Sequence, residues 1–188
     1  MPSTLARFLW RRLDSPGHDA CRFDKTATGY RLAGMAAFME GSRVCQLQYE
    51  VLANASFRTT RAHVAGQVGS RDVQLSIRCG RGGKWTVNGA KQPGLGGCVD
   101  LDLGFTPATN LLPIRRLALR VGQAARPNTV YLDIPSIRLR VIPQHYQRVA
   151  RDAYAYASPV HGYRATLQVS RHGAVVDYPE VFALETGR

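Results

Sequence analysis

Apolar and polar residues alternate with a repeat of two along much of this chain. In Ile137–Val141, the three aliphatic side chains point one way and the two intervening arginines point the other. The segment Leu117–Val121 alternates in the same manner. Because successive side chains of a β-strand lie on opposite faces, this pattern is typical of strands with one buried face. We therefore predict a strand at each of these two segments.

The same reasoning predicts most of the remaining chain to be β-structure. Further predicted strands are Ala20–Lys25, Tyr30–Phe38, Val44–Leu52, Arg58–Val64, Val73–Cys79, Thr129–Ile134 and Arg164–Val169. Asn88-Gly89, after the short run Lys84–Val87, is the dipeptide most typical of a type I′ hairpin turn. Arg171-His172-Gly173 predicts the turn of a terminal hairpin whose second strand ends at Pro179.

Helical signals are few. Thr106-Pro107 resembles a helix N-cap followed by proline at the first helical position, and Pro113 limits that helix to about two turns or shifts its boundary. The segment Gln144–Ala155 fits a helical stripe as well as a strand, and its continuing alternation favours a strand. Many strands at short spacing predict a mainly β barrel, roll or sandwich, formed by one domain over residues 1–188.

The amino-acid composition alone does not identify the class of binding partner. There are 25 basic residues against 13 acidic ones, a formal charge of +12, and all but three of the basic residues are arginines. Arginine suits carboxylates and phosphates, but a GC-rich coding sequence would also favour it. The arginines are spread along the chain without an RNA-binding aromatic motif, so nucleic acid is the least favoured partner.

Localisation and metal binding follow from what the sequence lacks. No apolar run is long enough to span a membrane, and the apolar patch at Leu9-Trp10 is closed at once by charged residues, unlike a signal peptide. The four cysteines form no CxxC pair and the five histidines have no metal-ligand spacing, which predicts no metal and no cofactor. We therefore expect a cytoplasmic protein with small, mostly buried thiols.

The densest group of candidate functional residues lies between Gly96 and Pro107. On a strand, Asp100 and Asp102 share one face, and two adjacent carboxylates can perform acid–base chemistry, bind a cation or accept sugar hydroxyls. The pair Arg115-Arg116 follows a proline-rigid turn and can either clamp an anion or pair with these aspartates. Internal pairing is the more economical hypothesis.

The aromatic residues are weaker evidence for a binding cavity than the aspartates. Trp85 and most of the tyrosines fall in predicted strands or at their ends. Their apolar rings and polar tips suit a cavity for acyl chains or sugar rings, although ordinary sheet packing explains any one of them equally well.

Together these stretches resemble a family named for glycolipid binding, formerly classified as a domain of unknown function. The likeness rests on these residues: Gly83-Lys84-Trp85, Asn88-Gly89, Gly97-Cys98-Val99-Asp100-Leu101-Asp102-Leu103, Thr106-Pro107-Ala108-Thr109-Asn110-Leu111-Leu112-Pro113-Ile114-Arg115-Arg116-Leu117, Gln144-His145-Tyr146 and Asp177-Tyr178-Pro179. Asp19 stands where the family usually has glutamate, Phe57 where it has tryptophan and Ser170 where it has aspartate.

The resemblance implies a many-stranded antiparallel sheet that forms a roll or half-barrel around a single short helix, remotely like bacterial lipoprotein-localisation factors. It also implies an acidic pocket for a glycolipid or similar sugar-bearing amphiphile. The residues that it places there are Asp19, Asp100, Asp102, Asn110, Arg116, Tyr146, Asp177 and Tyr178, and Trp85 is expected to hold the lipid portion.

Three functional hypotheses remain open from sequence. The favoured one is a non-catalytic binding module. The second is an enzyme acting on a sugar or lipid, with two of Asp100, Asp102 and Asp177 as acid and base. The third is a basic polyanion-binding protein. Strand edges or arginine-bearing faces could also support a homodimer.

Overall fold

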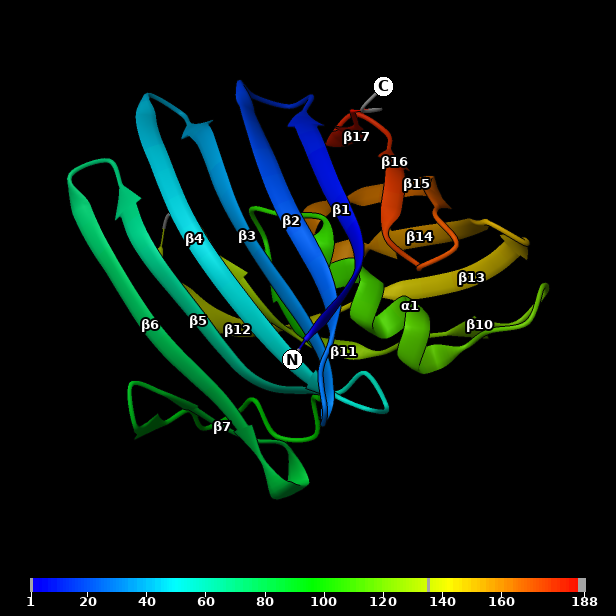
Figure 1. Ribbon diagram of the computed structural model, residues 1–188, viewed down its shortest axis with the longest axis horizontal. Helices are drawn as coiled ribbons and strands as arrows, with labels where there is room; N and C mark the ends of the chain where they lie inside the picture. Colours follow the sequence, from blue (N-terminus) through cyan, green and yellow to red (C-terminus); the bar gives the residue numbers. More distant parts are fainter. Residues whose placement is uncertain (1, 135, 186–188) are drawn as a thin grey trace.

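The computed structural model describes residues 2–134 and 136–185, so five residues of the predicted domain over 1–188 (1, 135 and 186–188) lie outside the described part. Most of the chain forms one 14-stranded antiparallel sheet (Figure 1). Its strands are β1 (Ser3–Arg12), β2 (Gly17–Lys25), β3 (Gly29–Glu40), β4 (Arg43–Asn54), β5 (Thr59–Val68), β6 (Arg71–Gly80), β7 (Lys84–Val87), β8 (Ala90–Lys91), β10 (Ala124–Ala125), β13 (His145–Ala150), β14 (Ala153–Ser158), β15 (Tyr163–Val169), β16 (Val175–Tyr178) and β17 (Phe182–Leu184).

The two ends of the chain meet inside this sheet. β1 pairs with β2 on one side and with β17 on the other, with Trp10 opposite Leu184. The strand order therefore runs from β10 through β13–β17 to β1 and on to β8. Figure 1 shows the long strands β1–β6 as one strongly twisted arm and β13–β15 as a second arm that crosses behind it. The sheet curves without closing into a barrel, as the resemblance implied.

A smaller sheet lies against the large one. It contains β9 (Leu101–Leu103), β11 (Asn128–Asp133) and β12 (Arg138–Pro143), in the order β12-β11-β9. β9 and β11 run parallel, and β11 and β12 are antiparallel. Leu101, Leu103 and Leu132 are at most 1% exposed and belong to the same core as Trp10 and Leu47 of the long strands. The inside of the half-barrel is therefore packed with side chains.

Residues 2–134 and 136–185 contain one α-helix, α1 (Leu111–Leu117), which follows the 3-10 turn η2 (Ala108–Asn110). Pro113 lies in the first turn of the helix, where a missing N–H costs nothing. Leu111 and Leu112 pack against the long strands and Ile114 packs against β13 and β14, so α1 joins the two arms. Two further 3-10 turns are η1 (Arg81–Gly83) and η3 (Pro159–His161).

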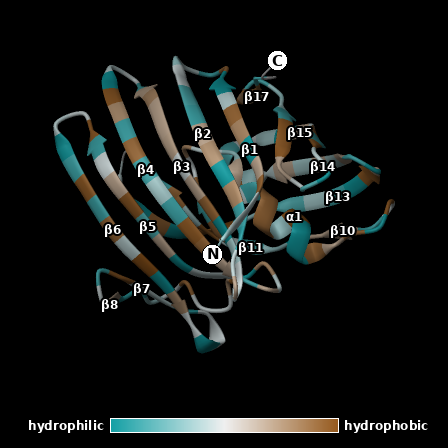
Figure 2. Ribbon diagram, viewed as in Figure 1, coloured by the Kyte–Doolittle hydropathy of each residue, from teal (hydrophilic) through white to brown (hydrophobic). Residues whose placement is uncertain are grey.

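The hydropathy pattern is that of a curved sheet buried on one face. Figure 2 shows hydrophilic and hydrophobic residues alternating along the long strands. The Asn88-Gly89 prediction is confirmed, because both residues have positive φ angles (48° and 83°) between β7 and β8. The segment Gln144–Ala155 is β-structure, as predicted, with a turn between β13 and β14.

The strand predicted at Leu117–Val121 is wrong. Leu117 ends α1, and Ala118 caps the helix in the left-handed conformation, with φ 46° and its N–H bonded to the Ile114 carbonyl. The alternation there reflects a buried Leu119 in a loop rather than a pleated strand. The strand β1 is the converse case, since its charged residues concealed an alternation in which Phe8 and Trp10 are buried.

Candidate functional site

A cavity of about 320 Å³ opens at the junction of the two arms and the small sheet. We call it the tyrosine pocket; its principal lining residues are Asp102, Asn110, Tyr131, Tyr156, Tyr163 and Tyr178. They come from β9, η2, β11, β14, β15 and β16, so six elements that are distant in sequence meet there. This volume lies at the lower end of the range of small-molecule sites in proteins.

Asp102 is one of three carboxylates that line the pocket, with Asp14 and Glu40. It lies in the middle of β9, between two leucines that point into the core, so its side chain points to the opposite face. Gln144 Nε2 donates a hydrogen bond to Asp102 Oδ2 at 2.6 Å, and Thr109 Oγ1 donates to Oδ1 at 3.2 Å. Burial raises the pKa of Asp102 to about 6, although these two hydrogen bonds counteract it. Because both partners are neutral, the carboxylate remains uncompensated when it ionises.

A chain of hydrogen bonds fixes the residues around Asp102. Gln144 Oε1 accepts from Thr129 Oγ1 at 3.1 Å and from the Tyr146 hydroxyl at 3.2 Å. Asn110 Nδ2 in turn donates to the Tyr146 hydroxyl at 3.0 Å. Tyr146 is itself only 1% exposed, so it supports Asn110 from behind rather than lining the pocket. The pocket's acceptor and amide are therefore pre-organised.

Aromatic rings form the walls. Tyr178 lies 5.3 Å from Tyr163 and 5.8 Å from Tyr156, measured between ring centroids. Burial raises the pKa of Tyr163 to about 12 and that of Tyr178 well above its usual value, so both stay neutral hydroxyls near pH 7. On the opposite side Tyr131 packs on Gly104, where a Cβ would lie 2.2 Å from the tyrosine hydroxyl. Gly104 thus makes room for the ring.

The rim is polar. The His161 ring packs against Tyr131 in a tilted arrangement, with ring centroids 4.9 Å apart, and its Nδ1 lies 2.9 Å from Ser158 Oγ. Burial and Arg140 lower the pKa of His161, which favours the neutral imidazole. Arg12 and Asp14 form an ion pair of 2.8 Å on the same rim. The rim therefore offers several donors and acceptors around the aromatic walls.

The predicted Asp100 and Arg116 pair with each other instead of entering the pocket. Asp100 is fully buried, and Arg116 grips it in a two-pronged ion pair, with Nε to Oδ1 at 2.9 Å and Nη2 to Oδ2 at 2.5 Å. Neither residue lines the tyrosine pocket. The hypothesis of internal pairing therefore holds for Asp100 and Arg116, which attach α1 to the strand that carries Asp102.

Asp19 lies in the core beside the pocket. Thr106 Oγ1 donates to its carboxylate at 2.5 Å and the Tyr49 hydroxyl donates at 2.9 Å. Burial raises the pKa of Asp19 to about 7. The Tyr49 ring crosses Gly34, where a Cβ would lie 2.5 Å from the phenol oxygen. Asp19 reaches the pocket only indirectly, through Thr106, which is part of the pocket lining.

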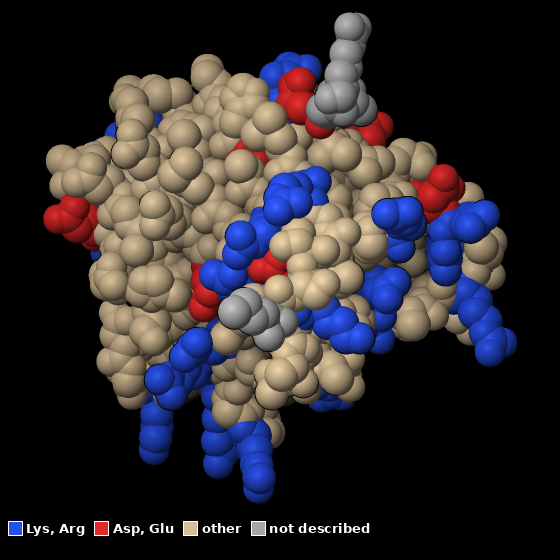
Figure 3. All heavy atoms as spheres, in the orientation of Figure 1, with Lys and Arg blue, Asp and Glu red and all other residues tan. Residues whose placement is uncertain are grey.

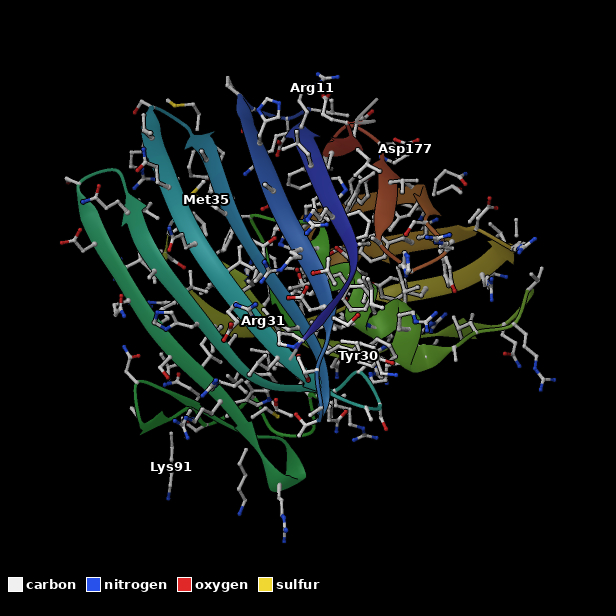
Figure 4. All side chains as sticks on the ribbon, in the orientation of Figure 1. Arg11, Tyr30, Arg31, Met35, Lys91 and Asp177 are labelled. Carbon is white, nitrogen blue, oxygen red and sulfur yellow. The ribbon has the colours of Figure 1, made fainter. Side chains whose placement is uncertain are left out.

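Of the remaining predicted site residues, Tyr178 lines the pocket, whereas Trp85 and Asp177 do not. Trp85 is 2% exposed and its indole N–H donates to the Cys98 carbonyl at 3.1 Å, so it is a core residue away from the pocket. Asp177 is exposed on β16, and Figure 4 shows it on the outer side of that strand. The structure thus brings Asp102, Asn110 and Tyr178 together at the cavity.

Sequence reasoning did not single out several lining residues. His161, Ser158 and Glu40 lie in turns or at strand ends with no local motif. The available signal was Gly104, a glycine in a dense motif beside a strand, because it marks close packing by a large side chain.

The described residues contain no group of three or more histidine, cysteine, aspartate or glutamate side chains arranged to hold a metal ion. All four cysteines are free, and Cys21, Cys45 and Cys98 are buried. No helix in residues 2–134 and 136–185 has the length and apolar character needed to cross a membrane.

Comparisons with known proteins agree with this architecture. No curated protein matches the chain. A solved structure of a DUF1089 family protein from Pseudomonas aeruginosa is 26% identical, with a TM-score of 0.80 over 89% of this chain and 91% of that one. A beta-barrel-like protein of the DUF1849 family from Brucella abortus shares the fold, at 15% identity and a TM-score of 0.52 over 95% and 93% of the two chains. The family model described as "Putative glycolipid-binding" matches residues 7–183, and the chain therefore belongs to that family.

Proposed function

We propose that the tyrosine pocket binds the sugar headgroup of a glycolipid or similar amphiphile, without chemical turnover. The observation that carries this proposal is Asp102, a carboxylate held by two neutral donors at a cavity that aromatic rings surround. A carboxylate in this setting accepts hydrogen bonds from sugar hydroxyls, and the faces of tyrosine rings suit the apolar face of a sugar. Family membership points the same way.

The size of the pocket favours a headgroup over a whole lipid. Its volume is about 320 Å³, and the interior of the half-barrel is already filled by residues such as Leu103 and Leu132. The apolar part of the pocket consists of Phe38, Phe105, Ile134, Val181 and Phe182. We expect the first part of a hydrocarbon chain to contact these residues, with the remainder of the chain leaving through the mouth.

Binding is favoured over catalysis because the expected acid–base pair is not assembled. Of Asp100, Asp102 and Asp177, only Asp102 lines the pocket. The other carboxylates in the lining are Glu40 and Asp14, and Asp14 is paired with Arg12. Asp100 is neutralised by Arg116, and Asp177 is exposed. Glycosidases need two carboxyl groups on opposite sides of the scissile bond, about 5 to 9.5 Å apart.

The proposal is tested with two amphiphiles that share an octyl chain. Octyl glucoside carries a sugar, whereas octyl tetraethylene glycol carries a polar head without a ring. Isothermal titration below the micelle concentrations is expected to give tighter binding of octyl glucoside. That affinity should weaken as the pH falls through about 6, because protonation of Asp102 replaces an acceptor with a donor. Equal affinity for both amphiphiles would contradict recognition of a sugar.

A further inference from the structure

A second cavity, about 650 Å³ in volume, lies at the C-terminal end of α1 and is lined by arginines. We call it the arginine groove, defined by Arg115, Arg148, Arg151 and Arg171 together with Tyr154 and Gly173. These residues come from α1, the β13–β14 hairpin and the turn before β16. On the face shown in Figure 3, basic side chains gather over the region where Figure 1 places α1, β10 and β13.

The groove brings four arginines to one cavity without a matching number of carboxylates. Elsewhere, Arg116 is paired with Asp100, Arg31 with Glu50 and Arg22 with Asp24. Within residues 2–134 and 136–185, none of the four groove arginines lies within 4.0 Å of a carboxylate oxygen. The groove's one acidic lining residue, Asp152, does not compensate four guanidinium groups. Four arginines that are distant in the sequence are therefore gathered at one cavity in the folded protein.

Two of the arginines are held in place by their surroundings. The Arg115 guanidinium lies over the Phe57 ring at 5.2 Å, and its aliphatic stem packs on Gly173, where a Cβ would lie 3.1 Å from Arg115 Cδ. Arg148 donates to the Leu119 carbonyl at 2.9 Å and to those of Ala150 and Arg151. Those bonds leave part of the Arg148 fork unused, and its charge stays at the groove wall. Such fixed guanidinium groups lose little freedom when they bind an anion.

Arg171 is the third groove arginine with a partner that orients it. Arg171 Nε lies 3.1 Å from His172 Nε2, so a neutral His172 can accept this hydrogen bond. Burial lowers the pKa of His172, with smaller contributions from Arg171 and Arg115. The neutral imidazole orients Arg171 and leaves its terminal nitrogens free to bind. Arginine forks facing a concave surface match the several oxygens of a phosphoryl group.

We propose that the arginine groove is a binding site for a phosphoryl group, contributed either by a small soluble phosphate compound or by a lipid headgroup. The site is separate from the tyrosine pocket. The two cavities share no lining residue: Asn110 of η2 lines the tyrosine pocket, and Arg115 of α1 lines the arginine groove.

The test compares Arg115→Gln/Arg171→Gln with Arg61→Gln/Arg78→Gln. Arg61 and Arg78 are exposed, face each other across β5 and β6 and line neither cavity, so the control removes the same charge elsewhere. Isothermal titration with inorganic phosphate is the first arm. Sedimentation with vesicles of phosphatidylcholine, with and without phosphatidic acid, is the second. Circular dichroism checks folding, and Arg171→Gln alone serves as a milder variant that keeps Arg115 on Phe57.

We expect the groove variant to lose about tenfold or more in affinity, because it removes two guanidinium groups that can donate charge-assisted hydrogen bonds to a phosphoryl group. The control should stay within about twofold of the wild type. Binding of inorganic phosphate identifies a soluble source, and binding only to vesicles with phosphatidic acid identifies a lipid source. The proposal is overturned if the wild type binds neither probe, or if the two double variants lose binding equally.

Discussion

Asp100 and Asp102 lie two residues apart, yet their surroundings differ completely. Arg116 occupies both oxygens of Asp100, which is fully buried beneath α1. Asp102 receives hydrogen bonds from two neutral groups and lies at the tyrosine pocket. The comparison shows that a carboxylate whose oxygens are both bound by an arginine has a structural role. Neutral partners instead leave a carboxylate with a raised pKa and with lone pairs that a ligand can use.

The largest effect is expected when the ion pair between Arg116 and Asp100 is broken. Arg116→Met should lower the free energy of unfolding by about 3 to 5 kcal/mol, because it leaves the buried Asp100 unpaired. Asp102→Asn should change it by no more than about 1 kcal/mol, since its partners are neutral. Urea unfolding followed by circular dichroism measures both. If the two variants were equally stable, the distinction between the two aspartates would fail.

The next effect concerns pH. The pKa of Asp102 is raised to about 6 and that of Asp19 to about 7, so the folded state binds more protons than the unfolded state between about pH 4 and pH 7. Their contribution to stability is therefore fully present below about pH 4 and is lost as the pH rises through 6 and 7. Each unit of displaced pKa corresponds to about 1.4 kcal/mol, so the decrease should exceed about 1 kcal/mol.

Urea unfolding between pH 4 and pH 8 measures this slope. Asp19→Asn should flatten the upper part of the curve and Asp102→Asn the part near pH 6. A stability that rises steadily with pH in both variants and in the wild type would contradict the raised pKa values.

A smaller effect separates core aromatic residues from pocket aromatic residues. Trp85→Phe removes the hydrogen bond to the Cys98 carbonyl and should cost about 1 to 2 kcal/mol of stability. Its affinity for octyl glucoside should equal that of the wild type, because Trp85 does not line the pocket. Calorimetry measures both the stability and the affinity for octyl glucoside. A loss of affinity without a loss of stability would show that Trp85 takes part in ligand binding.

The smallest effect is expected for Tyr178→Phe. It removes one hydroxyl from the pocket while keeping the ring, so the affinity for octyl glucoside should fall by about two- to fivefold. Tyr30→Phe is the matched control, because Tyr30 stacks on Phe57 outside the pocket. An unchanged affinity in Tyr178→Phe would remove this hydroxyl from the set of ligand contacts.

The sequence predicted the fold better than the site. Period-two alternation reports burial of one face, and most strands follow it; the failure at Leu117–Val121 arose because a buried loop leucine imitates the pattern. The sequence treated Asp100 and Asp102 as equivalent positions on one strand, but β9 begins at Leu101, after Asp100, and which aspartate meets an arginine depends on α1. Tyr131 belongs to the small sheet and His161 to η3, which follows β14 of the large sheet, so these two pocket residues meet only where the sheets pack together, for which the local sequence holds no signal.

The central claim is that Asp102 receives the sugar headgroup, and a matched pair of aspartate variants tests it most directly. Asp102→Asn and Asp177→Asn make the same chemical change, one at the pocket and one at an exposed position outside it. In isothermal titration with octyl glucoside at pH 7.5, Asp102→Asn should bind about tenfold or more weakly than the wild type, because a charge-assisted hydrogen bond is lost. Asp177→Asn should bind like the wild type. Wild-type affinity in Asp102→Asn, or an equal loss in both variants, would contradict the claim.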